Sequence, residues 1–230
     1  MFLRFYRTFV LISLILGCQP VLGQDLALGA NVGYASFRMQ SLKDYQSSTL
    51  AYGLPQKMPV VESFPSYFNF SVNGLIYLNK GYFSLTTGHT STAGRLYYSD
   101  YSGYYNSDQL VRMNYVSGGG ALRVRPPSSW NVFIGAHWSF YFNTLEINHS
   151  ENVLGVTNRY AQIYHSTNWG LEGYIEVQKR VKRIFLRCSA GGEIQVPGEL
   201  GLKDRSGDKV YIGGGGYRIN LGAAYTIKLW

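Results

Sequence analysis

The sequence predicts an all-β fold, a closed antiparallel up-and-down transmembrane β-barrel. Apolar and polar residues alternate with a period of two in several segments, most regularly near the C-terminus, where Tyr217, Ile219 and Leu221 share one face. The connections between these segments alternate between long and short. The chain has 20 Tyr and 27 Gly but only 15% charged residues, which is typical of many strands joined by turns. In a transmembrane barrel the apolar face meets lipid and the polar face lines the lumen.

Length, hydropathy and charge narrow the class of protein. A chain of 230 residues is long enough for one domain. Its mean hydropathy of -0.10 argues against a helical membrane protein but not against a barrel, because half of each spanning strand is polar. The formal net charge is +8, but Arg4 and Arg7 lie in the leader and much of the remaining excess lies in residues 179–183. We therefore expect no nucleic-acid partner.

The N-terminus has the pattern of an export signal. We expect residues 1–23 to be a signal peptide that is removed, and residues 24–230 to be the barrel domain, because a basic segment, an apolar core and small residues precede Gln24. The apolar core is about half of the ~20 residues that a spanning helix requires. The alternative is a lipobox in which Cys18 is acylated and becomes the mature N-terminus. With cleavage before Gln24, which we favour, Cys188 is the sole cysteine left and no intrachain disulfide can form.

The alternating segments predict eight strands. Each has its apolar residues on one face, and each is long enough for a tilted crossing of about 9–11 residues. Ten strands remain the alternative, if part of the first long connection also pairs. The expected strands are residues 25–38, 66–78, 82–92, 110–125, 130–145, 167–178, 184–196 and 210–230.

The connections sort by length along the chain. Residues 39–65, 93–109, 146–166 and 197–209 form long polar segments, whereas the turns at 79–81, 126–129 and 179–183 are short. A β-sandwich has no reason to alternate in this way, but an outer-membrane barrel has short periplasmic turns and long external loops. Both termini are then periplasmic. We also expect two aromatic girdles, with Tyr77, Tyr82, Trp130, Phe185 and Tyr225 at the periplasmic side and Tyr34, Phe68, Phe140, Phe142 and Trp169 at the outer side.

The architecture of about residues 25–230 resembles the small outer-membrane β-barrels of the OmpA/OmpX type. The aromatic C-terminus, with Tyr225 and Trp230, is similar to the signal by which the barrel-assembly machinery recognises that family, although Trp230 is out of phase with the apolar face that ends at Leu229. The resemblance implies a monomer in the outer membrane of a Gram-negative cell. Its expected partners are outer-membrane lipid and lipopolysaccharide, the assembly machinery and an extracellular protein or surface.

Charged residues with inward parity form one group of candidate residues. Eight strands leave an interior that side chains just fill, and unpaired charges there would be costly. We therefore expect a salt-bridged plug that fixes the register and closes the pore, rather than an ion path. Its predicted members are Arg123, Glu172, Glu176, Arg187, Glu193 and Arg218.

One short motif suggests chemistry. His89-Thr90-Ser91-Thr92 resembles the His-x-Ser-Asn motif of outer-membrane lipid A deacylases, in which His and Ser are base and nucleophile, but Thr92 replaces the Asn. Parity places His89 and Ser91 together on the lipid side of their strand, and no acid lies at the expected distance on the next one. We therefore predict that the motif is not catalytic.

No cofactor or metal site is expected. The glycine runs 118–120 and 213–216 lack the strand-to-helix context of a phosphate loop, and His137 alone does not make a metal site. The sequence thus favours a barrel without enzymatic activity that displays loops rich in Tyr, Ser and Asn, for envelope integrity, adhesion or partner contact. The alternatives are a lipid A deacylase-like esterase and a small, porin-like channel for apolar or ionic solutes.

Overall fold

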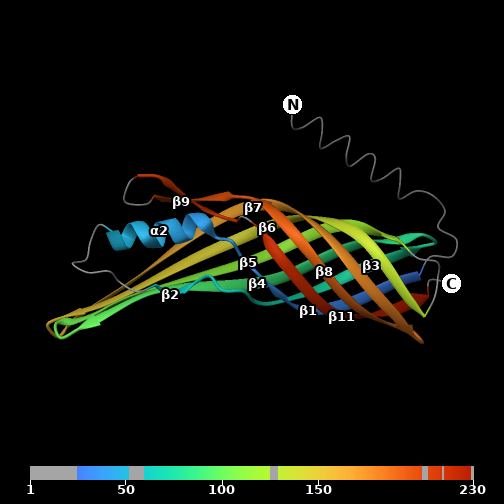
Figure 1. The fold of residues 1–230 in the computed structure, drawn as a ribbon, viewed down its shortest axis with the longest axis horizontal. Coiled ribbons are helices and arrows are strands. Elements are labelled where there is room, and N and C mark those ends of the chain that lie inside the picture. The colour runs from blue at the N-terminus through green and yellow to red at the C-terminus, as the bar shows by residue number, and fades with distance from the viewer. Residues whose placement is uncertain (1–24, 52–59, 125–128, 204–206, 214, 229–230) are drawn as a thin grey trace, which may run out of the picture.

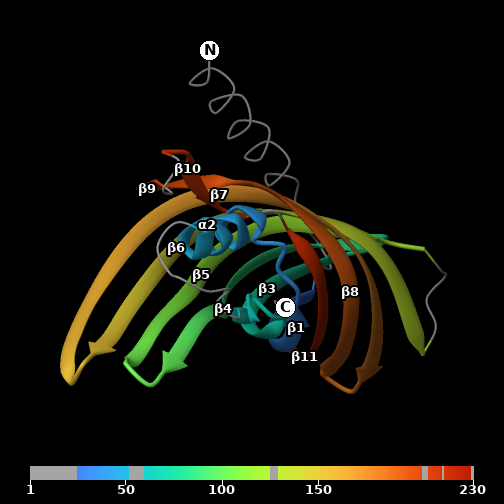
Figure 2. The ribbon, with the colours of Figure 1, turned by 60° about the vertical axis from the view of Figure 1, so that its left-hand side comes forward.

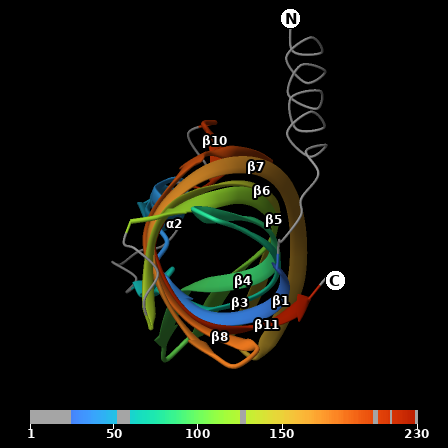
Figure 3. The same ribbon diagram turned by 90° about the vertical axis from the view of Figure 1, so that its right-hand side faces the viewer.

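Eight antiparallel strands close into a ring in the computed structural model, which describes residues 25–51, 60–124, 129–203, 207–213 and 215–228. Around the ring the order is β4-β3-β1-β11-β8-β7-β6-β5, and β5 pairs with β4 to complete it (Figure 3). The predicted fold class and the eight-strand count are confirmed. The ring strands are β1 (Asp25–Ala35), β3 (Tyr67–Leu78), β4 (Gly81–Asp100), β5 (Gly103–Arg123), β6 (Trp130–Val153), β7 (Val156–Val181), β8 (Ile184–Val196) and β11 (Gly216–Lys228).

The first long connection does contribute a strand, but not to the ring. The short β2 (Val60–Ser63) pairs with β4 at residues 94–96. The pairing of β3 with β4 stops at Asn69 and Thr90, so β2 lies beyond the end of β3 along the same edge. The ring therefore keeps eight strands, and the ten-strand alternative is wrong.

The two faces of the barrel wall have the composition of a membrane barrel. On β6, Trp138, Phe140 and Phe142 point outward and are about half exposed, whereas Ser139 and Tyr141 are buried in the lumen. The same alternation holds on the other ring strands, so exposed apolar side chains form a continuous belt. Members of the belt on other strands include Val32, Phe70, Leu85, Leu171, Leu186 and Leu221.

Four strands continue far past this belt. β6 has 24 residues and β7 has 26, and the part of β6 beyond Phe142 runs for roughly 35 Å along the strand. Residues 93–109 and 146–166, which we predicted as loops, are therefore paired hairpins that turn at Tyr101–Ser102 and Leu154–Gly155. We call these residues the β-extension. Figures 1 and 2 show it curving away from the barrel as one sheet.

Segments from two other connections cover the inner face of the strands where the β-extension leaves the barrel. One is the helix α2 (Gln40–Ala51), and the other is a pair of strands, β9 (Gly198–Lys203) and β10 (Lys209–Ile212). Ser41 at the start of α2 accepts a hydrogen bond from the backbone of Tyr211, at 3.0 Å. α2 and β9 lie beside the long strands in Figure 1. Together they bury an outer cluster made of Met39, Leu42, Phe64, Val111, Met113, Tyr115, Tyr141, Leu145, Ile147, Leu200, Leu202, Val210 and Ile212.

Within the described part of the chain, no helix is long and apolar enough to cross a membrane.

The other end of the barrel carries the first and last described residues and the short turns. Asp25 pairs with Lys228 and with Tyr77, so we call this the terminal end. Here the predicted girdle is partly wrong. Tyr77, Tyr82 and Phe185 point inward and are at most 9% exposed, because each directly adjoins an outward-facing residue of its strand and so has lumen-facing parity. Trp130 and Tyr225 are exposed on the outside, as are all five residues of the outer girdle. The inward side chains form a lower cluster of Ala27, Leu75, Tyr77, Tyr82, Ala121, Phe133, Tyr174, Phe185 and Ala224.

Candidate functional site

Two arginines organise the middle of the lumen. Arg187, from β8, binds Glu176 with two hydrogen bonds of 3.2 and 2.7 Å, and its third nitrogen donates to Asn73 Oδ1 at 2.9 Å. Arg218, from β11, lies 3.1 Å from Glu193 and 3.5 Å from Glu172. All these side chains are buried. The structure thus brings together five of the six charged residues that parity predicted to face inward.

Tyrosines complete this lumen network. Tyr141 donates to Glu193 and accepts from Arg218 Nη2 at 3.2 Å, while Tyr82 donates to Glu176 at 2.9 Å. Charge-assisted hydrogen bonds of this kind offset part of the cost of burying the charges. The two tyrosines also connect the network to the outer and lower clusters, to which they belong.

Arg123 lies apart from the network. Although its parity is inward, it sits at the terminal end of β5, where its Nη1 donates to the backbone oxygen of Asn79 at 3.4 Å. Its guanidinium lies 5.6 Å from the ring centroid of Phe133. The structure therefore gives Arg123 a place at the rim instead of beside the glutamates.

A second polar group in the lumen was not predicted. Ser84 Oγ lies 2.8 Å from His137 Nε2, and His137 Nδ1 lies 3.9 Å from Glu172 Oε2. The His137 ring fits against β5 because Gly119 lacks a side chain; a Cβ there would lie 2.5 Å from His137 Cδ2. The order of groups resembles a nucleophile, a base and an acid. However, Glu172 also binds Arg218, and the neighbouring cavity has a volume of about 40 Å³.

That cavity, in the middle of the lumen, is small. It lies between Asn73, His137, Tyr174, Arg187 and Arg218, and is large enough for one or two water molecules. The lower cluster closes it toward the terminal end, and the outer cluster closes it toward the extended end. Among the described residues, this cavity between the two clusters is too small for an acyl chain or a hydrated ion.

His89 and Ser91 lie on the outside of β4, at the edge of the belt next to the β-extension. His89 Nδ1 is 2.8 Å from Asn114 Oδ1 on β5, and its ring lies 5.3 Å from that of Phe70. Ser91 pairs in register with Arg112, which forms an ion pair of 3.2 Å with Glu146. The group that orients His89 is thus an amide instead of the carboxylate that a triad uses.

The tips of the β-extension are exposed and partly apolar. Tyr101 is fully exposed and Leu154 is 84% exposed, and a hollow of about 600 Å³ lies between the two turns. The first turn is held by Asp100, which accepts from the Ser102 hydroxyl at 2.6 Å and from the Tyr98 hydroxyl at 2.8 Å. These bonds, that from Ser102 first, lower the pKa of Asp100.

Histidine and tyrosine line the inner face of the β-extension near its tips. The ring of His149 stacks on Tyr160 with centroids 4.5 Å apart, and its Nδ1 lies 3.2 Å from the Tyr105 hydroxyl. Burial lowers the pKa of His149, while the charge of Glu151 acts in the opposite direction. Tyr105, His149 and Tyr160 thus connect three adjacent strands, β5, β6 and β7, on this face.

Several predicted features lie outside the described residues: the signal peptide at 1–23 with its Cys18, most of the short turn at 126–129, and Trp230. Among residues 25–51, 60–124, 129–203, 207–213 and 215–228, no group of three His, Cys, Asp or Glu side chains is arranged to hold a metal ion.

Comparisons with known proteins give likeness in structure alone. No protein-family model matches the chain, and no curated protein matches it. Among solved structures, Neisserial surface protein A (NspA) is similar with a TM-score of 0.38 and 13% identity, over 90% of this chain and 97% of that one. Ail, the attachment invasion locus protein of Yersinia pestis, is similar with a TM-score of 0.34 and 12% identity, over 89% of this chain and 97% of that one. A structure of Ail in complex with the heparin analogue sucrose octasulfate gives a TM-score of 0.35 and 10% identity, with the same coverage.

Proposed function

We propose that this protein is a non-enzymatic, monomeric barrel of a bacterial outer membrane whose β-extension contacts an extracellular partner. Its apolar belt and polar lumen support the membrane location, because this arrangement is stable only where lipid surrounds the barrel. In this location the barrel-assembly machinery inserts the chain, and membrane lipid and lipopolysaccharide surround the belt.

The β-extension lies outside the cell in this proposal, and the terminal end faces the periplasm. The turns at the terminal end are short, since β3 and β4 are joined through Asn79 and Lys80 and β7 and β8 through Lys182 and Arg183. In outer-membrane barrels the short turns are periplasmic and the long connections external. Signal-peptide cleavage before Gln24 is part of the same proposal.

The observation that carries the function is the paired, tyrosine-rich sheet that projects beyond the belt. Backbone hydrogen bonds hold β4 to β5, β5 to β6 and β6 to β7 along their full length. α2 and the β9–β10 pair support this sheet from the inner side. Such a sheet loses little conformational entropy on binding, and its exposed tip offers Tyr101, Leu154 and Tyr160, residue types suited to contact with a partner.

The two other candidate functions are less well supported. A channel requires an open path, whereas the cavity in the middle of the lumen has a volume of about 40 Å³ and lies between two packed clusters of described residues. A serine esterase requires an acid that orients the base, whereas His89 is bound to Asn114. A structural role in envelope integrity agrees with the closed barrel but does not account for the exposed apolar side chains at the tip.

Adhesion of whole cells tests the proposal. Cells that produce the protein should be retained on a panel of immobilised extracellular-matrix proteins and polysaccharides, and the double variant Tyr101→Ser/Leu154→Ser should lose most of that retention. Lys80→Ser, at the terminal end, is the matched control and should behave as wild type. The proposal fails if cells with and without the protein are retained equally, or if the tip variant binds as well as wild type at equal surface amount.

A further inference from the structure

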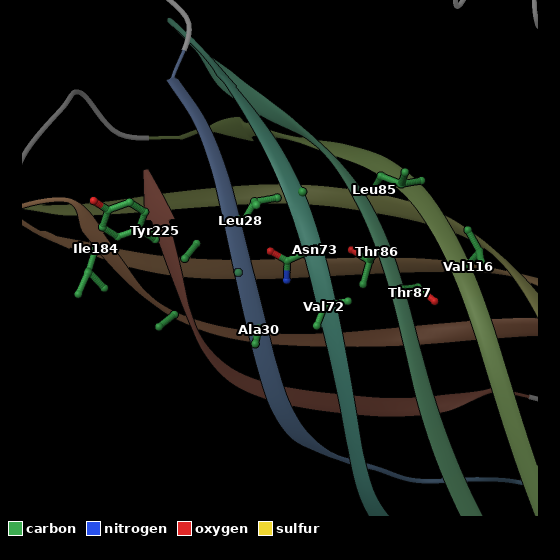
Figure 4. A pocket seen from close by; sticks show the side chains of 14 residues that line it. Leu28, Ala30, Val72, Asn73, Leu85, Thr86, Thr87, Val116, Ile184 and Tyr225 are labelled. Carbon is green, nitrogen blue, oxygen red and sulfur yellow. The ribbon is translucent and has the colours of Figure 1, made fainter. Parts of the chain in front are cut away.

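The outer wall of the barrel carries an apolar groove that the contact function does not use. It has a volume of about 710 Å³ and crosses β8, β11, β1, β3, β4 and β5 on the lipid-facing side (Figure 4). Pockets that bind small molecules have volumes of about 300–1,000 Å³. The groove is therefore large enough for part of a lipid.

Strand register explains the shape of the groove. Ile184, Tyr225, Leu28, Gly74 and Leu85 are consecutive partners across the strands, and they form one side. The other side is the adjacent row, Ala223, Ala30, Val72, Thr87 and Val116. Both rows contain small residues, Gly74 in the first and Ala30 and Ala223 in the second. The surface is lower at these positions than where the belt carries large side chains, and they form the floor of the groove. The groove spans five strand spacings, roughly 24 Å, which makes it long and narrow.

The groove begins at the terminal end and climbs into the belt. Ile184 is the first residue of β8, whereas Val116 lies well inside β5. In Figure 4 Ile184 and Tyr225 lie at one end of the row of side chains and Val116 at the other. A chain that enters beside Ile184 would therefore pass from the membrane surface toward the middle of the belt.

Positive charge is concentrated where the groove begins. Residues 179–183 contain Lys179, Arg180, Lys182 and Arg183. Arg183 is exposed and donates from Nη1 to the Tyr225 hydroxyl at 3.3 Å, so a lining residue of the groove holds a guanidinium at its mouth. Asp25 offsets part of this charge, because its carboxylate lies 3.7 Å from Arg180. Lys182, in the turn itself, is also exposed.

We propose that this groove binds one anionic phospholipid of the periplasmic leaflet, with its phosphate at Lys182 and Arg183 and one acyl chain between the two rows of residues. The placement in that leaflet rests on the proposed orientation of the barrel. Arginine and lysine are the usual partners of phosphate, and a narrow apolar groove suits a flexible hydrocarbon chain. A second copy of the barrel fits less well. A two-fold axis along the membrane normal and beside the groove would place the two basic turns close together at the same height, where their charges repel.

Lipid retention tests the inference independently of orientation and adhesion. The full-length mature protein is reconstituted in nanodiscs of phosphatidylcholine with a minor fraction of phosphatidylglycerol, and the lipids retained after gentle extraction are counted by native mass spectrometry. We expect one phosphatidylglycerol per barrel, retained in preference to phosphatidylcholine. Lys182→Gln and Arg183→Gln should each weaken retention about five-fold, as expected for one basic residue at an anionic lipid surface.

Matched variants separate the groove from general lipid contact. Gly74→Leu should abolish the preference by filling the floor, because a Cβ at residue 74 meets only Leu28 Cδ2, at 3.9 Å. Gly173→Leu is the control, since a Cβ there meets nothing within 4 Å and residue 173 lies on β7, outside the groove. Retained folding is checked by the mobility of unheated protein in SDS. Equal retention of the two lipids by wild type would overturn the inference, as would unchanged retention in Gly74→Leu or a dimer that Gly74→Leu dissociates.

Discussion

Arg187 and Arg218 show how far side-chain parity predicts a barrel interior. Alternation along a strand decides which residues face the lumen, so the inward direction of both arginines and of Glu172, Glu176 and Glu193 follows from the sequence. Parity does not give the position of a residue along the barrel axis, because that position depends on the register between neighbouring strands, which cannot be read from one strand alone. This explains why Arg123, with the same parity, lies at the rim beside Asn79.

Removing one arginine should leave buried carboxylates without their cation. We predict that Arg218→Ala lowers the free energy of unfolding by about 3–5 kcal/mol, because Glu172 and Glu193 then remain buried and charged. Urea titration of the folded barrel in micelles measures this change. Lys203→Ala, at an exposed residue of β9, should change it by less than about 0.5 kcal/mol. Equal stability of wild type and Arg218→Ala would show that the lumen is hydrated and that the network does not plug it.

The pair His89 and Ser91 illustrates a motif whose chemistry depends on its neighbours. A working nucleophile or base is worth several orders of magnitude in turnover. We predict instead that Ser91→Ala and His89→Ala leave the lipid A mass profile of producing cells the same as with wild type. Ser99→Ala, a serine substitution elsewhere on the same strand, is the matched control and should also give the wild-type profile. Release of a fatty acid from lipid A by wild type but not by Ser91→Ala would make this protein an enzyme.

The strand elements were predictable within the belt and not beyond it. β8 has the predicted bounds, Ile184–Val196, because both of its ends lie at the limits of the apolar alternation. β4 to β7 continue into segments in which the outer face turns polar, so the period-two signal fades. On β6 the apolar residues change sides, from Phe140 and Phe142 outside to Leu145 and Ile147 inside. This change of phase marks the point where the strand leaves the belt and joins the outer cluster, and it could have been found in the sequence.

The helix α2 carried a weaker sequence signal. It is mostly polar, and the buried residues Leu42 and Gln46, with the half-buried Tyr45, form a narrow contact stripe. A stripe with spacings of three and four residues indicates a helix. This stripe contains only three residues, and the polar residues around it are typical of a loop. Its stability comes from packing against the β-extension and not from intrinsic propensity.

The inner face of the β-extension should loosen at acidic pH. Burial lowers the pKa of His149, so the unfolded segment binds a proton more readily than the folded one. The stabilisation is therefore complete above the ordinary histidine pKa of about 6.5 and is lost as the pH falls below it. Hydrogen exchange at residues 146–163, corrected for intrinsic rates, should quicken between about pH 7.5 and about pH 5.5. His149→Gln should remove this dependence, and His165→Gln, at an exposed histidine on β7, should keep it. An unchanged pH dependence in His149→Gln would contradict the assignment.

The molecule as a whole combines a membrane barrel with a soluble-type core. The belt and the charged lumen follow the pattern of a transmembrane barrel. Where β5 and β6 leave the belt, they have a buried apolar face, with Val111, Met113, Leu145 and Ile147, and a more exposed polar one, as in a soluble sheet. α2, β9 and β10 supply the second layer of that core, which closes the lumen and supports the projecting tips. Pairings between such distant segments depend on the closed ring, so no local sequence pattern could predict them.

Cysteine labelling of intact cells tests the central claim, that the barrel crosses an outer membrane with the β-extension outside. In a Cys188→Ser background, Tyr101→Cys places a thiol at the tip of the β-extension and Lys80→Cys places one at the terminal end; both native side chains are exposed. A membrane-impermeant maleimide should label Tyr101→Cys on intact cells, and should label Lys80→Cys only after the outer membrane is permeabilised. Labelling of Lys80→Cys but not Tyr101→Cys on intact cells would invert the orientation, and equal labelling of both would contradict a membrane-spanning barrel.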